Sequence, residues 1–149
     1  MTAGEYCNRE VIITEQTTSV IEAAILMRQH HVGDLVVVEK QAEKTVPIGI
    51  ITDRDLVIEV IAQKVEPGSL SVKDIMSTDL LSVDEKETLL DTLEIMQKKS
   101  VRRVLVVDGQ GSLQGLLSAD DVIELIAEAM NNLTKLVKRE VSREEKEHP

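Results

Sequence analysis

The sequence contains LVVVE at residues 35–39 and VLVVD at residues 104–108, two apolar runs separated by an offset of 69 positions. Further along, PIGIIT at residues 47–52 matches LQGLLS at residues 113–118, and there the offset has fallen to 66. Correspondence between several segments at a nearly fixed offset indicates an internal duplication. The chain therefore consists of two copies of one unit, and the first copy has three more residues in one loop.

Each copy is predicted to form a strand, a helix, two strands and a second helix. The two quoted runs lack polar alternation, which is typical of a strand that is covered on both faces. In the first copy, Ser19 and Glu22 predict a capping box at the start of a helix that ends near His31, and Thr88 with Asp91 repeats the box in the second copy. The fold class is therefore α+β or α/β, with a small mixed sheet and two helices in each copy.

Two glycines, Gly49 and Gly115, fall at equivalent places inside predicted strands. A glycine inside a strand usually marks a bulge or the close approach of another backbone or a ligand.

Helical and turn signals divide the chain into a first repeat at residues 8–66, a second repeat at 72–130 and a C-terminal helical extension at 131–149.

The last predicted helix begins near Asp120 and keeps an apolar pattern through Leu133, Val137 and Val141. A helix of this length would project beyond a small domain, and its apolar edge could contact a second subunit. Folding back onto its own chain would bury the same edge, and the pattern does not decide between the two. Residues 142–149 are mostly charged, so we expect them to fray.

Composition excludes several classes of function. Lys and Arg total 17 against 27 Asp and Glu, so the net charge is −10, the reverse of the excess that a nucleic-acid-binding protein needs. Tyr6 is the single aromatic residue, so platforms for base stacking are absent. We therefore expect neither DNA nor RNA as a ligand.

Cysteine and histidine content points away from disulfides and metals. Cys7 is the only cysteine and three histidines accompany it, without the spacing of a metal site. No apolar run approaches the roughly 18 residues of a membrane span, and the N-terminus lacks the features of a signal peptide. We expect a cytoplasmic protein that does not bind membranes.

The functional signal is a motif that occurs once in each copy, as GIITDRD at residues 49–55 and GLLSADD at residues 115–121. Each apolar strand ends at a hydroxyl residue, and a carboxylate follows three positions later in the first turn of a helix. Free N–H groups at a helix start can donate to a phosphate together with the hydroxyl, while the carboxylate can accept hydrogen bonds from ribose hydroxyls. The same spacing also satisfies a capping box, which needs no ligand.

The chain resembles the cystathionine-beta-synthase-type (CBS) domain family from about residue 8 to residue 130. The similar segments are VGDLVVV at 32–38, VKDIMS at 72–77 and VRRVLVV at 101–107, besides the two motifs above. The resemblance implies tandem repeats packed about a pseudo-twofold axis, a Bateman module, with two clefts between them. It also implies an adenosine ligand such as AMP, ADP or ATP, with S-adenosylmethionine as a further candidate, and no required cofactor.

Residue roles follow from the resemblance position by position. Asp55 and Asp121 would hold ribose hydroxyls, while Thr52 and Ser118 would meet the phosphate. The adenine would lie against backbone and aliphatic side chains near two further residues, Ile12 and Leu81.

The two clefts are expected to differ. Arg102 and Arg103 precede the second copy's central strand, where a guanidinium could bind phosphate in forked geometry. Gly33 and Asp34 hold the matching positions in the first copy, and a carboxylate there would repel a polyphosphate. We predict one better nucleotide site that uses Arg102 or Arg103 and one weaker or empty site, unless the arginine pair is only a solvated surface doublet.

Two functions remain, and neither is catalytic. The first is a regulatory energy or metabolite sensor in signal transduction, in which an adenosine nucleotide changes the relation between the repeats and an unknown protein target reads the change in trans. The second is a ligand-free scaffold for dimerisation or protein interaction. We expect a homodimer in either case and no enzyme, because the sequence offers no nucleophile–base pair, metal cluster or glycine-rich phosphate loop.

Overall fold

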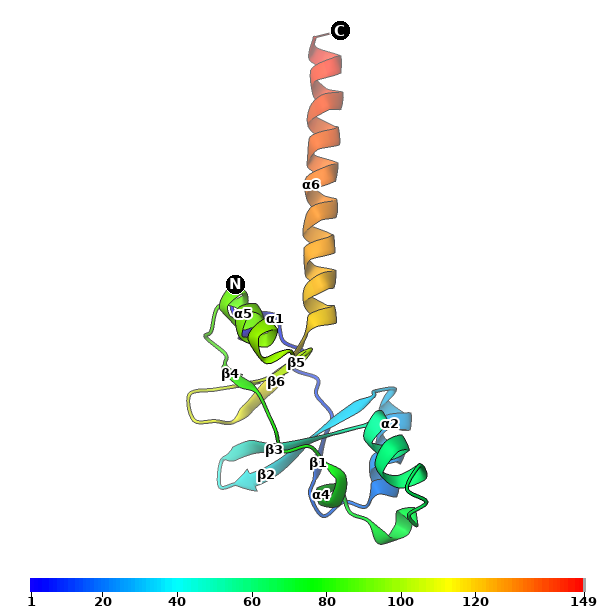
Figure 1. The fold of residues 1–149 in the computed structure, drawn as a ribbon. Coiled ribbons are helices and arrows are strands. Elements are labelled where there is room, and N and C mark those ends of the chain that lie inside the picture. The colour runs from blue at the N-terminus through cyan, green and yellow to red at the C-terminus, as the bar shows by residue number, and fades with distance from the viewer. Residues whose placement is uncertain (149) are drawn as a thin grey trace.

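The computed structural model describes residues 1–148, which fold into two similar repeats (Figure 1). Each repeat has a three-stranded sheet in which the first strand pairs parallel to the second, and the second pairs antiparallel to the third. The strands are β1 (Ile13–Glu15), β2 (Asp34–Gln41) and β3 (Lys44–Thr52) in the first repeat, and β4 (Ser82–Asp84), β5 (Arg103–Val107) and β6 (Leu113–Ser118) in the second.

Helices connect and follow these strands. The helices between strands are α2 (Val20–His30) and α5 (Leu89–Lys99), and the helices after the third strands are α3 (Asp53–Leu56), continued by the π-helical η1 (Val57–Ile61), and α6 (Ala119–Glu147). Three short elements precede the repeats or link them: α1 (Ala3–Tyr6), η2 (Pro67–Ser69) and α4 (Val72–Ile75). The predicted order of strand, helix, strand, strand and helix is confirmed in both repeats.

The two connecting helices begin and end in the same way. Ser19 and Thr88 are their N-caps, and each hydroxyl accepts from the backbone N–H three residues later at 3.1 Å. The return bond that would complete each predicted capping box is not formed. His31 and Ser100 end the helices in the left-handed region, with φ of 53° and 54°.

The second strand of each sheet is buried on both faces, as predicted. On one face of β2, Leu35 and Val37 pack into a core with α2, while on the other face Val36 and Val38 meet Leu105 of the second repeat. β5 follows the same division, because Val104 and Val106 face α5 and Leu105 faces the first repeat. The molecule therefore has one core under the helices of each repeat and a third core between the two sheets.

The segment before each repeat pairs with the third strand of the other repeat. The backbone around Asn8 pairs with Leu116 in β6, and Ser77 pairs with Ile50 in β3. Gly115 and Gly49 lie beside these crossings, where an added Cβ would stand 2.7 Å from the Asn8 carbonyl oxygen and 2.5 Å from the Met76 sulfur, respectively. Both strands also carry a register shift nearby. The predicted reasons for the glycines, a bulge and close backbone approach, are both confirmed.

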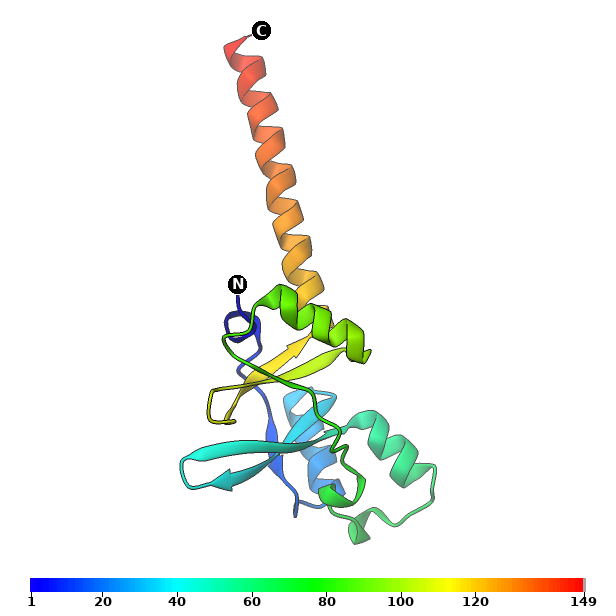
Figure 2. The same ribbon diagram turned by 60° about the vertical axis from the view of Figure 1, so that its left-hand side comes forward.

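The C-terminal helix α6 leaves the body of the molecule and projects from it (Figures 1 and 2). It does not fold back on its own chain: Val122 is buried, whereas Met130, Leu133 and Val137 are each more than half exposed. The expectation that the chain frays from residue 142 is wrong as far as Glu147, where the helix ends. No helix within residues 1–148 is both long and apolar enough to cross a membrane.

Candidate ligand-binding site

A polar pocket of about 230 Å³ lies at the seam between the two repeats. The second repeat lines it with the end of β6, the start of α6 and the start of β5, and the first repeat contributes the turn before β2. The segment that crosses β6 adds one residue. The lining residues are Asn8, Val32, Gly33, Asp34, Arg103, Leu116, Ser118, Asp120 and Asp121.

In the second repeat, the helix start leaves polar groups open toward this pocket. The Ser118 hydroxyl accepts from the Asp121 backbone N–H at 3.1 Å, and the Ala119 N–H donates to the Arg102 carbonyl at 2.8 Å. Within the described residues, the Asp121 carboxylate has no hydrogen-bond or ion-pair partner. It can therefore accept bonds from a ligand, and the Ser118 hydroxyl still has its own hydrogen to donate.

In the first repeat, the equivalent groups are used by the protein itself. The Thr52 hydroxyl accepts from the Asp55 N–H at 3.1 Å, and the Asp55 carboxylate accepts from the Thr52 N–H at 2.9 Å. This is a complete capping box. The Asp53 N–H donates to the Gly33 carbonyl, and the Arg54 N–H to the Asp53 carboxylate. Thr52 and Asp55 do not line the seam pocket.

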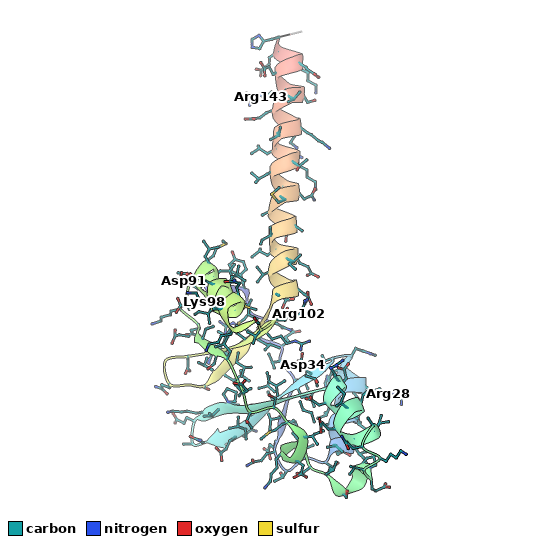
Figure 3. The ribbon with its side chains drawn as sticks, in the orientation of Figure 1. Arg28, Asp34, Asp91, Lys98, Arg102 and Arg143 are labelled. Atoms are coloured by element: carbon teal, nitrogen blue, oxygen red, sulfur yellow. The ribbon has the colours of Figure 1, made fainter. Side chains whose placement is uncertain are left out.

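The two arginines have different surroundings. Arg103 lines the pocket, and its Nε lies 3.2 Å from Oδ2 of Asp34 in the other repeat. Arg102 lies at the base of α6, outside the pocket lining, and its guanidinium bonds the Asp120 carboxylate at 2.8 Å with both side chains about three quarters exposed. Figure 3 shows Arg102 and Asp34 on opposite sides of the seam. Of the two arginines, the geometry therefore favours Arg103 as a ligand contact.

The two predicted adenine neighbours lie away from this pocket lining. The Ile12 carbonyl accepts from the Val36 N–H at 3.1 Å, and the Leu81 carbonyl accepts from the Leu105 N–H at 2.9 Å, so both continue the parallel strand pairing. Leu81 lines a separate small cavity of about 170 Å³ with Val101. Ile12 packs against the same core cluster as Val32, which does line the seam pocket.

The structure thus brings together three of the eight predicted site residues: Arg103, Ser118 and Asp121. Of the other six lining residues, Leu116 and Asp120 lie inside the second motif, Gly33 and Asp34 were expected in the other cleft, and Asn8 and Val32 were missed. Gly115 was the available signal for Asn8, because it indicates that another backbone crosses the strand beside the motif. Val32 begins the segment 32–38 that resembles the CBS family, but whether it reaches this pocket depends on how the two repeats pack, which the sequence does not show.

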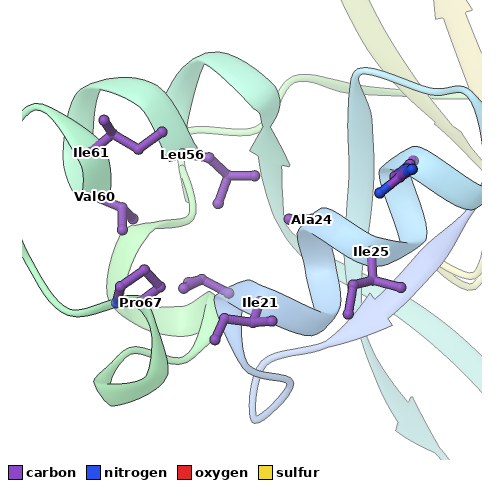
Figure 4. A pocket seen from close by; sticks show the side chains of 9 residues that line it. Ile21, Ala24, Ile25, Leu56, Val60, Ile61 and Pro67 are labelled. Carbon is purple, nitrogen blue, oxygen red and sulfur yellow. The ribbon is translucent and has the colours of Figure 1, made fainter.

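A larger cavity of about 420 Å³ lies on the first repeat between α2 and the α3–η1 segment (Figure 4). Its walls are almost entirely aliphatic, including Ile21, Ile25, Val60 and Ile61. It lacks the convergent polar groups that fix a nucleoside in place, so it is an apolar surface groove and a weaker candidate for such a ligand.

Other reactive groups form no further site within the described part of the chain. No group of three or more His, Cys, Asp or Glu residues among residues 1–148 is placed to hold a metal ion. Burial raises the pKa of the Cys7 thiol above its ordinary value, which lowers its thiolate fraction at neutral pH.

Comparison with known proteins gives a consistent result for both repeats. The family model described as CBS domain matches residues 3–62 and 72–128. A CBS domain-containing protein of Bacillus subtilis, YhcV, is 34% identical over 113 residues, which is 76% of each chain. The uncharacterized protein MK0525 of Methanopyrus kandleri is 37% identical over 125 residues, which cover 84% of this chain and 62% of that protein.

Among solved structures, the CBS domain pair of protein MJ0100, in complex with 5′-methylthioadenosine and S-adenosyl-L-methionine, superposes with a TM-score of 0.72. The match covers 87% of this chain and 98% of that one at 22% identity. At this identity the similarity establishes the fold, a tandem pair of repeats.

Proposed function

The chain belongs to the CBS domain family, and we propose that it is a regulatory module that binds an adenosine ligand in the seam pocket. The observation that carries the proposal is the convergence of Ser118, Asp121 and Arg103 with the turn before β2 of the other repeat. A carboxylate without a protein partner, a hydroxyl and a guanidinium in one pocket complement a ribose and its 5′ substituent. The MJ0100 complex supports this ligand class.

Each pocket residue has a proposed role. Asp121 accepts hydrogen bonds from the ribose hydroxyls, and Ser118 and Arg103 lie beside the 5′ substituent. The adenine lies against Val32, with Ile12 in the same core cluster. In the first repeat, a ligand would have to share the Asp55 carboxylate with the helix cap, so we propose that this second cleft, toward Leu81, is weaker or empty.

The pocket also suggests how binding becomes a signal. Its walls come from both repeats, so an occupied pocket adds contacts that hold the repeats in one relative arrangement. A ligand shifts such an equilibrium by its difference in affinity for the two arrangements. We propose that a protein target in trans recognises the ligand-bound arrangement, and that AMP, ADP, ATP and S-adenosylmethionine are the ligands to test.

A thermal-shift panel with these four ligands tests the proposal. A ligand that binds only the native state adds about 2.7 kcal/mol to the free energy of unfolding when its concentration is 100 times Kd, and this raises Tm. At least one ligand should raise the Tm of the wild-type chain, and Asp121→Asn should remove that shift. Glu124→Gln, which removes a carboxylate one turn further along α6, should keep it. If none of these ligands, nor 5′-methylthioadenosine, raises Tm, the sensor proposal is wrong.

A second candidate function, assembly through α6, is favoured by the apolar stripe on that helix. Ile126, Met130, Leu133 and Val137 are each 54–59% exposed. Their 4-3-4 spacing places them on one face of the helix. A contiguous exposed stripe of this kind usually marks an interaction surface.

We propose a second copy of the chain as the partner, because charge is unevenly distributed along α6. The four carboxylates of residues 120–128 precede the stripe's centre, whereas residues 135–143, which follow it, carry four Lys or Arg and one Glu. An antiparallel pair of α6 helices would set residues 120–128 of one copy beside residues 135–143 of the other, at a separation near the Debye length of about 10 Å. Light scattering should find a dimer, and Leu133→Glu should give a monomer, whereas the exposed Thr17→Glu should not. A wild-type monomer at micromolar concentration would refute self-association.

A further inference from the structure

The ion pair between Asp34 and Arg103 lies where the two repeats meet. These residues occupy equivalent positions of the duplicated unit, at the offset of 69 residues, and their side chains touch at 3.2 Å. Equivalent positions related by a twofold axis can touch only near that axis. The pair therefore lies next to the pseudo-twofold axis, and both of its side chains line the seam pocket.

In the absence of a ligand, the Arg103 guanidinium is already paired with the Asp34 carboxylate. The Asp34 side chain is only 19% exposed, compared with 48% for Arg103. A carboxylate with so little contact with water depends on its cationic partner, because removing that partner would leave a poorly solvated charge. A phosphate that entered the pocket would have to compete with Asp34 for Arg103 and would lie close to a second negative charge.

The remaining lining adds negative charge. The pocket lining contains three carboxylates, Asp34, Asp120 and Asp121, and one basic residue, Arg103. The Asp120 carboxylate is held by Arg102 from outside the lining, but the Asp121 carboxylate has no cationic partner within the described residues. A phosphate monoester brings a charge of about −1.5 to −2 at neutral pH, so it would meet the unpaired charge of Asp121 and would have to share Arg103 with Asp34.

The size of the pocket limits the length of the 5′ substituent. Its volume of about 230 Å³ lies below the roughly 300–1,000 Å³ of typical small-molecule sites. A nucleoside with a short 5′ substituent would fill it. The phosphate chain of ATP and the methionine chain of S-adenosylmethionine would both extend beyond the lining, so size does not separate AMP from 5′-methylthioadenosine and the charge of the lining has to.

Resting on the proposed adenosine site, we propose that this pocket selects adenosine ligands whose 5′ substituent has no net negative charge, and that Asp34 determines this preference. A thioether such as 5′-methylthioadenosine is neutral at that position, and the sulfonium of S-adenosylmethionine is cationic. AMP and ATP are the disfavoured ligands. From the sequence, the better nucleotide site was expected to use Arg102 or Arg103, and Asp34 was expected to weaken the other cleft. That expectation for Asp34 is wrong, because Asp34 lines the same pocket as Arg103 and pairs with it.

Titration calorimetry on the full chain tests this selection with adenosine, 5′-methylthioadenosine, S-adenosylmethionine, AMP and ATP. The uncharged or cationic ligands should bind at least about tenfold more tightly than AMP or ATP, because juxtaposed like charges are strongly unfavourable. Asp34→Asn should tighten AMP binding by about tenfold and change 5′-methylthioadenosine binding by less than about threefold. Asp53→Asn, which removes an exposed carboxylate outside the lining, should leave the order of affinities unchanged.

The wild-type panel gives a result even if Asp34→Asn fails to fold. AMP or ATP binding as tightly as 5′-methylthioadenosine, or more tightly, would overturn the proposed selection and leave the adenosine site standing. Binding by none of the five ligands would overturn the adenosine site itself. An unchanged preference in a folded Asp34→Asn variant would show that Asp34 is not the determinant.

Discussion

The helix starts of the two repeats share one pattern and use it differently. In the first repeat, Thr52 and Asp55 bond each other in both directions, so one oxygen of the Asp55 carboxylate is already used by the helix cap. In the second, Ser118 caps the helix alone, and the Asp121 carboxylate faces the seam pocket without a protein partner. One hydroxyl-to-carboxylate spacing can thus serve as a cap or as a binding site, and the return hydrogen bond distinguishes the two.

The helices that follow these starts also differ. α3 lasts four residues before it becomes the π-helical η1, which ends at Ile61, whereas α6 continues for 29 residues. Four of the five residues in η1 are Val or Ile, whose branched side chains lower helix propensity, and Lys64, with φ of 55°, takes the chain out of the helix three residues later. The two copies of the duplicated unit therefore end differently: the first in a short helical segment, and the second in a long helix with an apolar stripe.

The largest expected contrast is in ligand binding. Asp121→Ala should weaken binding of the tightest adenosine ligand on the order of 100-fold, because two hydrogen bonds to a charged acceptor are lost. Asp55→Ala should change the affinity by less than about threefold, since its carboxylate already serves the helix cap. Calorimetric Kd values for both variants check this. Equal losses in the two variants would mean that both repeats bind the ligand.

The second contrast concerns the two strand glycines. Gly115→Ala should lower the free energy of unfolding by about 2–3 kcal/mol, because the new methyl group meets the Asn8 backbone. Gly49→Ala should cost about 1–2 kcal/mol, since its nearest neighbour is the end of the flexible Met76 side chain. Urea unfolding measures both values. A larger loss in Gly49→Ala would contradict the assignment of the rigid crossing to Gly115.

A smaller contrast separates the two caps. Thr52→Ala should lower the unfolding free energy by about 1–2 kcal/mol, because it removes the hydroxyl bond to the Asp55 N–H and weakens the return bond from the Thr52 N–H to the Asp55 carboxylate. Ser118→Ala should cost about 0.5–1 kcal/mol, since only one cap bond is lost. Thr17→Ala, at an exposed position, is the control for the change in composition. If Ser118→Ala proved the more destabilising variant, the first repeat's box would not be the stronger cap.

The smallest expected effect is on the reactivity of Cys7, which lies against Gly115 as Met76 lies against Gly49. Its raised pKa means that a smaller fraction is thiolate at pH 8 than in a free cysteine, so alkylation should be slower there and should accelerate as pH rises. Denaturant should remove the difference. Alkylation at the rate of an unfolded control would show that the segment before the first repeat does not dock on β6.

Much of this architecture follows from local sequence signals. The duplication, the doubly buried strands and the purpose of Gly49 and Gly115 are local patterns with a direct physical meaning. The distribution of site residues between clefts is different, because it depends on how the repeats pack. Arg102 and Arg103 are adjacent in sequence, yet one lies at the seam and the other bonds Asp120 outside the lining. Asp34 pairs with Arg103 only because the pseudo-twofold axis places equivalent positions together.

The central claim, that the seam pocket at the start of α6 binds the ligand and its counterpart at the start of α3 does not, is tested most directly by the stoichiometry of 5′-methylthioadenosine in titration calorimetry. One molecule per wild-type chain is expected, with the heat of binding lost in Asp121→Ala and kept in Asp55→Ala. Two equivalent molecules per chain, or a titration unchanged by Asp121→Ala, would contradict it.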